Sequence, residues 1–261
     1  MRFSQVQVGQ LRKHIAGRGD GSMMKMKTVY ITGCDRGLGL ALVQSFLNEG
    51  FAVFAGSYLP EWPELQELKK EVGEQLHILS LDVTDANSVQ LAADEITRVT
   101  PKLDILINNA AIYTDQDGDI METLDFTAIR NMYETNTLGP LRVTQSILPL
   151  LLQGESKLLV NISSEAGSIT DCKRVKEYGY TMSKAALNMQ SVLLQNKLKQ
   201  FGVKVFAIHP GYVKSYMLGK FNTEATVEAQ DSARGIVQQL LQPHLIDGPI
   251  FINYEGHLLN W

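Results

Sequence analysis

The sequence predicts an α/β domain in which helices cover both faces of one parallel sheet. From Lys27 onward, short runs rich in β-branched, aromatic and other apolar residues alternate with stretches of helical spacing. A glycine-rich turn follows the first of these runs, and no repeat, low-complexity tract or linker interrupts the alternation. Short strands separated by helices imply right-handed crossovers and a sheet covered on both faces. We therefore expect a single doubly wound domain over residues 27–261.

Local signals place the elements in order. Residues 28–31 form a β-branched and aromatic run, and the helical spacing that follows stops at Gly50, a residue suited to a helix C-terminus. Pro101 ends a later helical stretch, and the apolar run that contains Asp104 and stops at Asn108 predicts a buried strand. The expected strands are residues 28–31, 51–57, 77–81, 103–107, 157–162, 203–208 and 249–253, and the first three expected helices are residues 38–48, 65–72 and 86–99.

Composition excludes several classes of protein. Of 261 residues, 44% are hydrophobic and 20% are charged, as in globular proteins and unlike disordered or fibrous chains. The formal net charge of −4 argues against nucleic-acid binding driven by counterion release. No apolar run approaches the roughly 20 residues that span a bilayer, so we expect no membrane partner. Two cysteines without metal-ligand spacing fit a reducing compartment, and we expect a cytoplasmic protein without a metal.

Residues 1–26 differ from the rest and predict a flexible basic extension. Arg2, Arg12, Lys13 and Arg18 precede the first acid, Asp20. A basic, acid-poor N-terminus is typical of an organelle transit signal, which would make the location mitochondrial. The simpler interpretation is an extension ahead of an internal start, because the segment is short on serine and only weakly amphipathic.

The turn after the first strand has the sequence TGCDRGLG, and helical spacing follows at once. A strand that turns sharply beside a pyrophosphate needs glycine, because a Cβ would block the approach of the backbone. The N-terminus of the next helix offers free N–H groups and the positive end of its dipole to the phosphates. Ordinary strand–helix turns also contain glycines, but the position after the first strand favours a dinucleotide site. The expected contacts are Gly33, Asp35, Arg36, Gly37, Leu38 and Gly39.

The spacing TGxxxGxG resembles the glycine turn of the classical short-chain dehydrogenases/reductases. Asp82-Val83-Thr84 follows the third strand, where that family places an Asp beside the adenine ring. Residues 108–111, Asn-Asn-Ala-Ala, are similar to the family's NNAG motif, with Ala111 replacing glycine. Taken alone, Asp82 is also a candidate helix N-cap and Asn108 a candidate turn residue. The resemblance covers about residues 27–261 and implies a Rossmann fold with cofactor contacts from Asp82, Val83, Asn109 and Ala110.

The end of the second strand bears on the choice between NAD and NADP. NAD enzymes usually place an acid there, about 20 residues beyond the turn, to bind the ribose 2′-hydroxyl. Residues 55–59 contain no acid, and the first one after them is Glu61. Arg36 supplies a cation where NADP-preferring members of the family often carry one, near the ribose 2′-phosphate of NADP. Ser57 is placed to donate a hydrogen bond to the same phosphate. We expect NADPH to be preferred over NADH; the alternative is that Arg36 is a solvated surface charge and either cofactor is used.

Tyr180 and Lys184 form the YxxxK pair of a helix, four residues apart and so on one face. A tyrosine has an ordinary pKa of about 10 and is a poor acid or base near neutrality. A neighbouring ammonium stabilises the phenolate and lowers the pKa, which makes the pair useful for proton transfer. Tyr178 cannot form such a pair, because the residue four positions later is Met182 and not a lysine.

The resemblance implies further roles at the site. Ser164, with Ser163 as the fallback, is implied to orient the substrate carbonyl, and Asn136 to hold a water beside Lys184 in a proton relay. Lys184 is also implied to bind the nicotinamide ribose. The segment after the sixth strand is similar to the family's PGxVxT motif, which contacts the nicotinamide. The implied cofactor-binding residues there are Pro210, Gly211, Val213 and Ser215.

Both ends of the matched region resemble the sniffer-type carbonyl reductases and C-factor-like proteins. That branch uses NADPH to reduce reactive carbonyls, with Tyr180 here as the implied general acid. Tyr180 follows Ser164 by 16 residues, longer than is common in the family, and the insert over residues 168–176 is expected at the pocket rim. Tyr212 stands where Trp is usual and Ser215-Tyr216 where Thr-Asp is common, which puts the substrate in doubt.

The expected substrate loop lies near residues 211–230. Tyr216, Met217, Leu218 and Phe221 give it either an apolar face for a carbonyl substrate or the residues that pack it down. His209, before Pro210 at a strand end, is expected to be structural. Family members commonly form homodimers or homotetramers through the helices that carry Asn136 and Tyr180.

Two functions remain open. One is an NADPH-dependent oxidoreductase acting on a ketone, aldehyde or quinone. The other is a cofactor-binding signalling or regulatory protein of the same fold, because fold alone does not fix function. The presence of all four implied catalytic residue types favours the enzyme.

Overall fold

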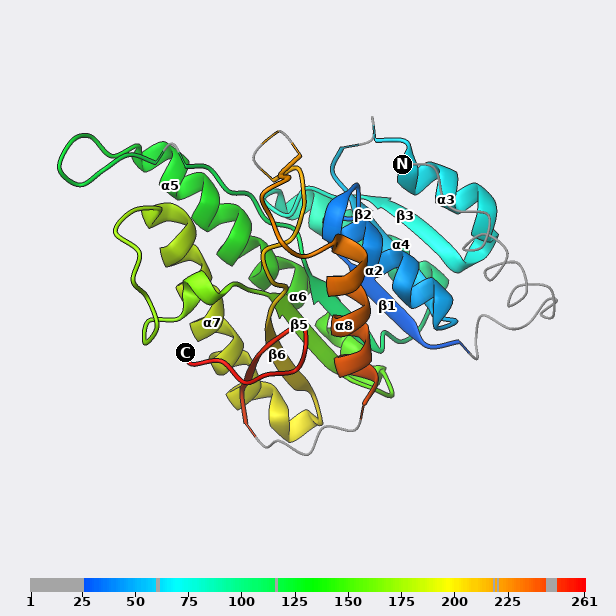
Figure 1. Ribbon diagram of the computed structural model, residues 1–261. Helices are drawn as coiled ribbons and strands as arrows, with labels where there is room; N and C mark the ends of the chain where they lie inside the picture. The colour runs from blue at the N-terminus through cyan, green and yellow to red at the C-terminus, as the bar shows by residue number, and fades with distance from the viewer. Residues whose placement is uncertain (1–25, 60–61, 116, 218, 220, 243–247) are drawn as a thin grey trace.

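The computed structural model describes residues 26–59, 62–115, 117–217, 219, 221–242 and 248–261 (Figure 1). Most of the basic N-terminal segment, together with Glu61 and Leu218, lies outside the described residues. Seven strands form one sheet in the order β3-β2-β1-β4-β5-β6-β7, and every neighbouring pair is parallel. They are β1 (Thr28–Ile31), β2 (Ala52–Ser57), β3 (Leu76–Ser80), β4 (Ile105–Asn108), β5 (Leu158–Ile162), β6 (Lys204–His209) and β7 (Ile250–Asn253). The predicted doubly wound fold is confirmed.

Helices cover both faces of this sheet (Figure 1). One face packs against α2 (Gly37–Asn48), α3 (Glu64–Val72) and α8 (Ala229–Leu241). The other packs against α4 (Ala86–Val99), α6 (Gly139–Gln153) and α7 (Tyr178–Leu198). Alternate residues of one strand enter the two cores, with Val29 and Ile31 on the first side and Tyr30 on the second, because successive side chains of a strand point to opposite faces. Strands buried on both sides explain why the sequence shows nearly continuous apolar runs.

The helix signals act where they were expected, with small shifts. Gly50 has a φ of +78° directly after α2, and Asp85 caps α4 by accepting from Asn87 N. The fourth strand begins two residues later than predicted. Leu103 N donates instead to Leu150 O, and Asp104 uses its carboxylate to join neighbouring segments.

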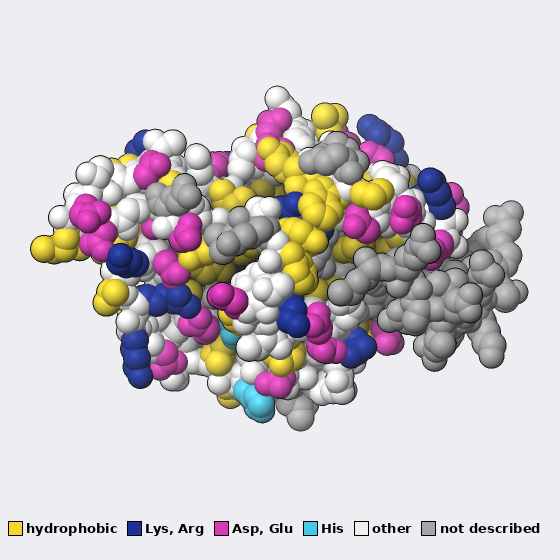
Figure 2. All heavy atoms as spheres, turned by 45° about the horizontal axis from the view of Figure 1, so that its top comes forward, with side chains coloured by type: hydrophobic (Ala, Val, Ile, Leu, Met, Phe, Trp, Pro, Cys, Tyr) yellow, Lys and Arg dark blue, Asp and Glu magenta, His cyan; other side chains and the backbone are white. Residues whose placement is uncertain are grey.

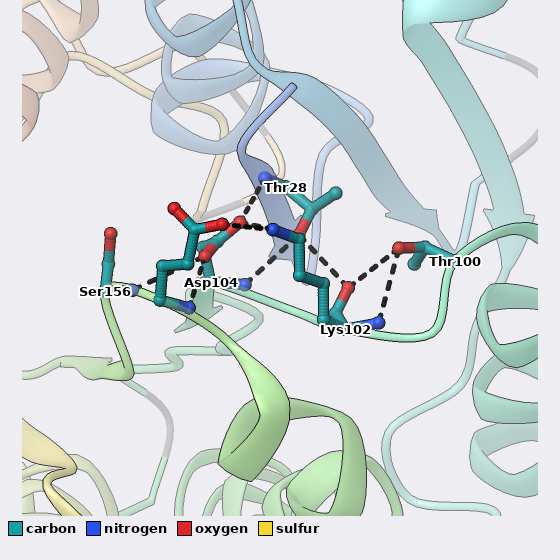
Figure 3. A network of polar contacts seen from close by, with 6 residues as sticks. Thr28, Thr100, Lys102, Asp104 and Ser156 are labelled. Atoms are coloured by element: carbon teal, nitrogen blue, oxygen red, sulfur yellow. Dashed lines mark hydrogen bonds and ion pairs between the residues drawn. The ribbon is translucent and has the colours of Figure 1, made fainter. Parts of the chain in front are cut away.

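Asp104 organises the amino-terminal edge of the sheet (Figure 3). Its side chain is fully buried and accepts from Thr28 N at 2.8 Å, Thr28 Oγ1 at 3.1 Å and Glu155 N at 2.8 Å. Ser156 N donates to it at 3.4 Å. One carboxylate therefore holds the beginnings of β1 and β4 and the turn that leads into β5.

The carboxyl ends of all seven strands meet at the opposite edge. The strand order reverses between β1 and β4, since β2 and β3 lie to one side of β1 and β5 to β7 lie beyond β4. In open α/β sheets a crevice forms outside the strand ends at such a reversal, and ligands bind in it. The predicted motifs that begin at Gly33, Asp82, Asn109, Ser164 and Pro210 all follow strand ends at this edge.

Candidate active site

A cleft of about 1140 Å³ opens at the carboxyl ends of the strands. In Figure 2, where the top of Figure 1 comes forward, hydrophobic side chains gather around the hollow in the middle of the face. Of the predicted site residues, only Ser57 and Asn136 do not line this cleft. Those that line it are Gly33, Asp35, Arg36, Gly37, Leu38, Gly39, Asp82, Val83, Asn109, Ala110, Ser164, Tyr180, Lys184, Pro210, Gly211, Val213 and Ser215. The structure thus brings motifs from five strand ends and from the start of α7 into one cavity.

The glycine turn is shaped by close packing as well as by its opening to the cleft. Gly33 has a φ of +69°, and a Cβ there would lie 2.8 Å from Cα of Ala110. A Cβ on Gly39 would lie 2.0 Å from the carbonyl oxygen of Gly33. Helix α2 begins after Arg36, whose side chain has no acceptor for the first N–H groups of the helix. This cradle suits an anionic group at the helix N-terminus.

Asp35 places a carboxylate at the end of β2, where residues 55–59 contain no acid. Its buried carboxylate accepts from Ser57 Oγ, Tyr58 N at 3.1 Å and Leu59 N at 3.0 Å. An acid therefore does lie at the end of β2, supplied by the glycine turn rather than by the strand itself. The Ser57 hydroxyl, which we expected to donate to a phosphate, donates to this carboxylate.

Arg36 joins the glycine turn to the substrate loop. Its guanidinium lies 4.6 Å from the ring centre of Trp62 and 5.7 Å from that of Tyr216, and it donates to Tyr216 O at 3.4 Å. The ring centre of Tyr216 also lies 5.1 Å from that of Phe221. Of the two interpretations of the loop's apolar residues, packing fits Phe221, Met217 lines the cleft, and Tyr216 does both.

The motifs after β3 and β4 have different tasks. Asp82 accepts from the backbone and hydroxyl of Thr84, and the N-cap of α4 is Asp85, so the interpretation of Asp82 as a helix N-cap is wrong. Asn109 ties the two sides of the cleft together, because its amide donates to the carbonyl oxygens of Thr32 and Gly33. Asn108 is a buried strand residue, not a turn residue, and it donates to Asn161 Oδ1 at 2.9 Å.

The two serines after β5 are not equivalent. Ser163 is buried and donates to Asn188 Oδ1 at 2.6 Å. The Ser164 hydroxyl is hydrogen-bonded to Tyr180 and accepts from Ala166 N. The geometry therefore favours Ser164 over Ser163 as the serine that faces the tyrosine.

Tyr180 and Lys184 lie in the first two turns of α7 and line the cleft together. Burial raises the pKa of Tyr180, while the hydrogen bond from Ser164 and the positive charge of Arg174 oppose that increase. Lys184 is 2% exposed, and burial lowers its pKa to about 8. Its Nζ donates to Ile162 O at 2.8 Å and lies 5.7 Å from the Tyr180 ring centre. The groups that lower the pKa of Tyr180 are thus Ser164 and Arg174 rather than the expected Lys184, and burial outweighs them.

The hydroxyl of Tyr178, the tyrosine without a partner lysine, donates to Val175 O. His209 lines the cleft, and burial lowers its pKa, which keeps its imidazole neutral. Within the described part of the chain, the Nδ1 atom of His209 has no hydrogen-bond partner.

Asn136 is buried, with 1% of its surface exposed. It lies in a π-helical turn, Glu134–Leu138, between α5 (Phe126–Tyr133) and α6. Its Oδ1 accepts from Ile112 N, and its Nδ2 donates to Ile112 O and to Ser183 Oγ. These bonds connect the segment after β4 to α7. They do not involve Lys184, so the relay role of Asn136 stays a prediction.

The rim beside Tyr180 holds Arg174, from the insert that we expected there, and other residues that the sequence did not single out. The ring of Tyr113 meets that of Tyr180 edge-on, with centres 5.0 Å apart. The Tyr113 hydroxyl donates to Glu177 at 2.6 Å, and Arg174 pairs with both Glu177 and Glu165. The only available signals were the aromatic residue that closely follows the Asn-Asn motif and a basic insert of unusual length.

Two kinds of feature are absent from the described residues. None of their helices has both the length and the apolar character needed to cross a membrane. Nor do their His, Cys, Asp and Glu side chains form a group of three or more able to hold a metal ion.

Comparisons with known proteins agree with this geometry. The model of the family described as short chain dehydrogenase matches residues 27–226. An uncharacterized oxidoreductase of Schizosaccharomyces pombe is 38% identical over 191 residues, which are 72% of this chain and 74% of the relative. The carbonyl reductase Sniffer of Drosophila melanogaster is 30% identical, with a TM-score of 0.83 over 90% of this chain and 100% of that one. NADPH-bound carbonyl reductase from chicken fatty liver is 32% identical, with a TM-score of 0.80 over 90% and 99%.

Proposed function

Because the chain belongs to the short chain dehydrogenases, a family of oxidoreductases, we propose that it is an NADPH-dependent carbonyl reductase acting on a ketone, aldehyde or quinone. One observation carries the proposal. Tyr180 lines the cleft with a hydrogen bond to Ser164 and with Lys184 one helical turn away. A proton donor, a second hydroxyl and a buried cation thus converge beside the glycine turn.

The cleft fits a dinucleotide. The glycine turn and the N-terminus of α2 would hold the pyrophosphate, Asp82 and Val83 the adenine end, and Lys184 the nicotinamide ribose. Pro210, Gly211, Val213 and Ser215 would border the nicotinamide. A bound NADPH supplies the hydride that the carbonyl carbon receives.

The chain's own residues handle the proton and the carbonyl oxygen. Tyr180 gives its phenolic proton to that oxygen, and Ser164 donates a hydrogen bond to the same atom, where negative charge develops. Lys184 stays close to the Tyr180 ring, so its positive charge favours the phenolate left behind. Asn136 holds the segment after β4 against α7 through its hydrogen bonds with Ile112 and Ser183.

Preference for NADP is the finer part of the proposal. Arg36 supports it, because its guanidinium lines the cleft beside the glycine turn. The NADPH-bound chicken enzyme and an NADP complex of a Pseudomonas aeruginosa carbonyl reductase, 27% identical with a TM-score of 0.75, also support it. The Asp35 carboxylate opposes it, since a negative charge at the end of β2 repels a 2′-phosphate.

The test is NADPH oxidation against a panel of quinones, aldehydes and diketones. We expect turnover with at least one class of carbonyl. Tight NADPH binding without turnover on any class would contradict the proposal and favour a cofactor-binding regulatory protein. Equal turnover with NADH would contradict the cofactor preference alone.

We also propose that two copies pair through α5 and α7. Exposed apolar side chains lie along this surface, among them Phe126, Tyr133, Met182, Met189 and Leu193. Light scattering after gel filtration should give a dimer or tetramer mass, and Leu193→Glu should reduce it. A monomeric mass for the unaltered chain would contradict pairing.

A further inference from the structure

Arg174 bridges two carboxylates that flank the candidate catalytic pair. Its Nη2 lies 2.6 Å from Glu165 Oε1, and its Nη1 pairs with Glu177. Glu165 directly follows Ser164, and Glu177 precedes Tyr180 by three residues. The planar guanidinium offers donors in a fixed fork, so it can hold both carboxylates at a set separation. The bridge therefore connects the segment that carries Ser164 to the start of the helix that carries Tyr180.

The start of that helix needs such support. Glu177 has a φ of +66°, a left-handed conformation that is uncommon for a side chain other than glycine. Its carboxylate is held on two sides, by Arg174 and by the Tyr113 hydroxyl at 2.6 Å. The ring of Tyr113 in turn packs edge-on against Tyr180. Release of Glu177 would free both the first turn of α7 and a ring that contacts Tyr180.

The bridge lies at the rim of the cleft, where it contributes little to the stability of the fold. The side chains of Glu165, Arg174 and Glu177 are 53%, 37% and 27% exposed. Isolated ion pairs with this exposure contribute little to folding. Their shared geometry, however, fixes groups whose placement decides the rate, since a misplacement of about 1 Å can cost about 100-fold.

We propose that Arg174, carried by the long insert, is a positioning residue that sets the gap between Ser164 and Tyr180 during carbonyl reduction. The inference rests on the proposed reductase function. It assigns a purpose to the insert: the additional residues between Ser164 and Tyr180 deliver a cation back to the two segments that the insert joins.

The charged surroundings of Tyr180 give the proposal a signature in pH. The titratable and charged groups that face it are Tyr113, Glu165, Arg174, Glu177 and Lys184. Arg174 lowers the pKa of Tyr180, whereas Glu165 and Glu177 raise it, although burial has the larger effect. Removing the guanidinium leaves both carboxylates unopposed, so the pKa rises. Because reduction needs the protonated phenol, its alkaline limb moves to higher pH.

The experiment compares Arg174→Met, Arg174→Lys and the control Lys173→Met. Lys173 is the exposed neighbour in the same insert, so its replacement removes one positive charge without touching the bridge. With a carbonyl that the unaltered enzyme reduces, Arg174→Met should lower kcat by about 10- to 100-fold. Its NADPH Kd and Tm should stay near those of the unaltered chain, and the alkaline limb should move upward. Arg174→Lys should be intermediate, since an ammonium holds one carboxylate but lacks the fork.

A double-mutant cycle tests the bridge itself. If Arg174 acts through Glu165, then Arg174→Met combined with Glu165→Gln should be no slower than Arg174→Met alone. Additive losses, or an Arg174→Met enzyme with the kcat and pH profile of Lys173→Met, would overturn the proposal. Absence of any turnover by the unaltered chain is a separate result that counts against the reductase function. In that case, amide exchange over residues 178–184 would still have to be faster in Arg174→Met than in Lys173→Met, or the bridge has no positioning role.

Discussion

The buried Asp104 at the amino-terminal edge of the sheet differs in its hydrogen bonding from several buried polar groups at the carboxyl-terminal edge. At the amino-terminal edge, the Asp104 carboxylate is fully buried and accepts from three residues in two chain segments (Figure 3). At the carboxyl-terminal edge, several buried polar atoms lack a hydrogen-bond partner within the described residues. They are Asn108 Oδ1, Thr181 Oγ1, Asn188 Nδ2 and His209 Nδ1. Lys184 is almost as deeply buried as Asp104 but, among the described residues, its one hydrogen-bond acceptor is the carbonyl oxygen of Ile162.

This difference separates residues that maintain the fold from residues available for chemistry. A carboxylate with all its hydrogen bonds made contributes stability and cannot easily change partners. A buried cation with few partners is costly to hold, yet it is ready to bind a ligand or stabilise a developing charge. Variants at the two edges should therefore divide into those that change stability and those that change turnover.

Tyr180→Phe should give the largest effect and leave the fold alone. It removes only the phenolic proton donor, so kcat/KM should fall by about 10² to 10⁴-fold. NADPH affinity and Tm should stay close to those of the unaltered chain. Tyr178→Phe, two residues earlier on the same helix, should have little effect on either. Steady-state kinetics decides the matter: retained turnover in Tyr180→Phe contradicts the assignment of the general acid.

Asp104→Asn should show the reverse pattern. The amide would turn a donor toward backbone N–H groups that now donate to the carboxylate, and we expect a loss of about 3 kcal/mol in the free energy of unfolding. Turnover per folded molecule should not change. Urea unfolding measures the loss, and Asp94→Asn on the outer side of α4 is the matched control. Equal stability of these two variants would mean that the Asp104 network does not hold the amino-terminal edge.

Lys184→Met should reduce turnover and increase stability. A pKa of about 8 in place of about 10.5 means that the folded state binds the proton less tightly than the unfolded state. At pH 7 this difference costs about 3 kcal/mol, part of which the variant should recover. The stability of the unaltered chain should rise as pH increases from about 8 to about 10.5, because there the unfolded state binds more protons. The variant should lack this rise in urea unfolding at each pH; a less stable Lys184→Met would count against the argument.

Arg36→Ala should have the smallest effect, seen mainly in cofactor choice and accompanied by a change in the Michaelis constant for the carbonyl substrate. Loss of the cation should reduce the preference for NADPH over NADH by about ten-fold, or about 1.4 kcal/mol. Asp35→Asn should move the ratio of kcat/KM values the other way, because it removes the carboxylate at the end of β2. If both variants lower kcat/KM equally with the two cofactors, Arg36 and Asp35 support the turn but do not select the phosphate.

The sequence predicted the parts of the site that depend on neighbours along the chain. The motifs around Gly33, Asp82 and Asn109 each follow a strand end, and in a parallel sheet those ends must meet. Every predicted strand is present within two residues of its expected bounds. Local spacing was sufficient because each motif lies within a single strand–turn–helix unit.

Contacts between segments that are distant along the chain could not be predicted from local spacing. Asp35 folds back to the end of β2, more than 20 residues away along the chain, and supplies the carboxylate that the strand itself lacks. Tyr113 and Glu177 meet only because α7 and the segment after β4 come together in the fold. No spacing rule anticipates such pairs, which depend on side-chain direction in three dimensions.

The stacking of Arg36 on Trp62 and Tyr216 has a consequence for enzyme engineering. One cation contacts both the wall that would recognise the cofactor and the loop that would cover the substrate. Substitutions that redirect the enzyme toward another nicotinamide coenzyme should therefore also change the Michaelis constant for the carbonyl compound. Specificity for the cofactor and specificity for the carbonyl substrate both depend on Arg36, so they cannot be redesigned one at a time.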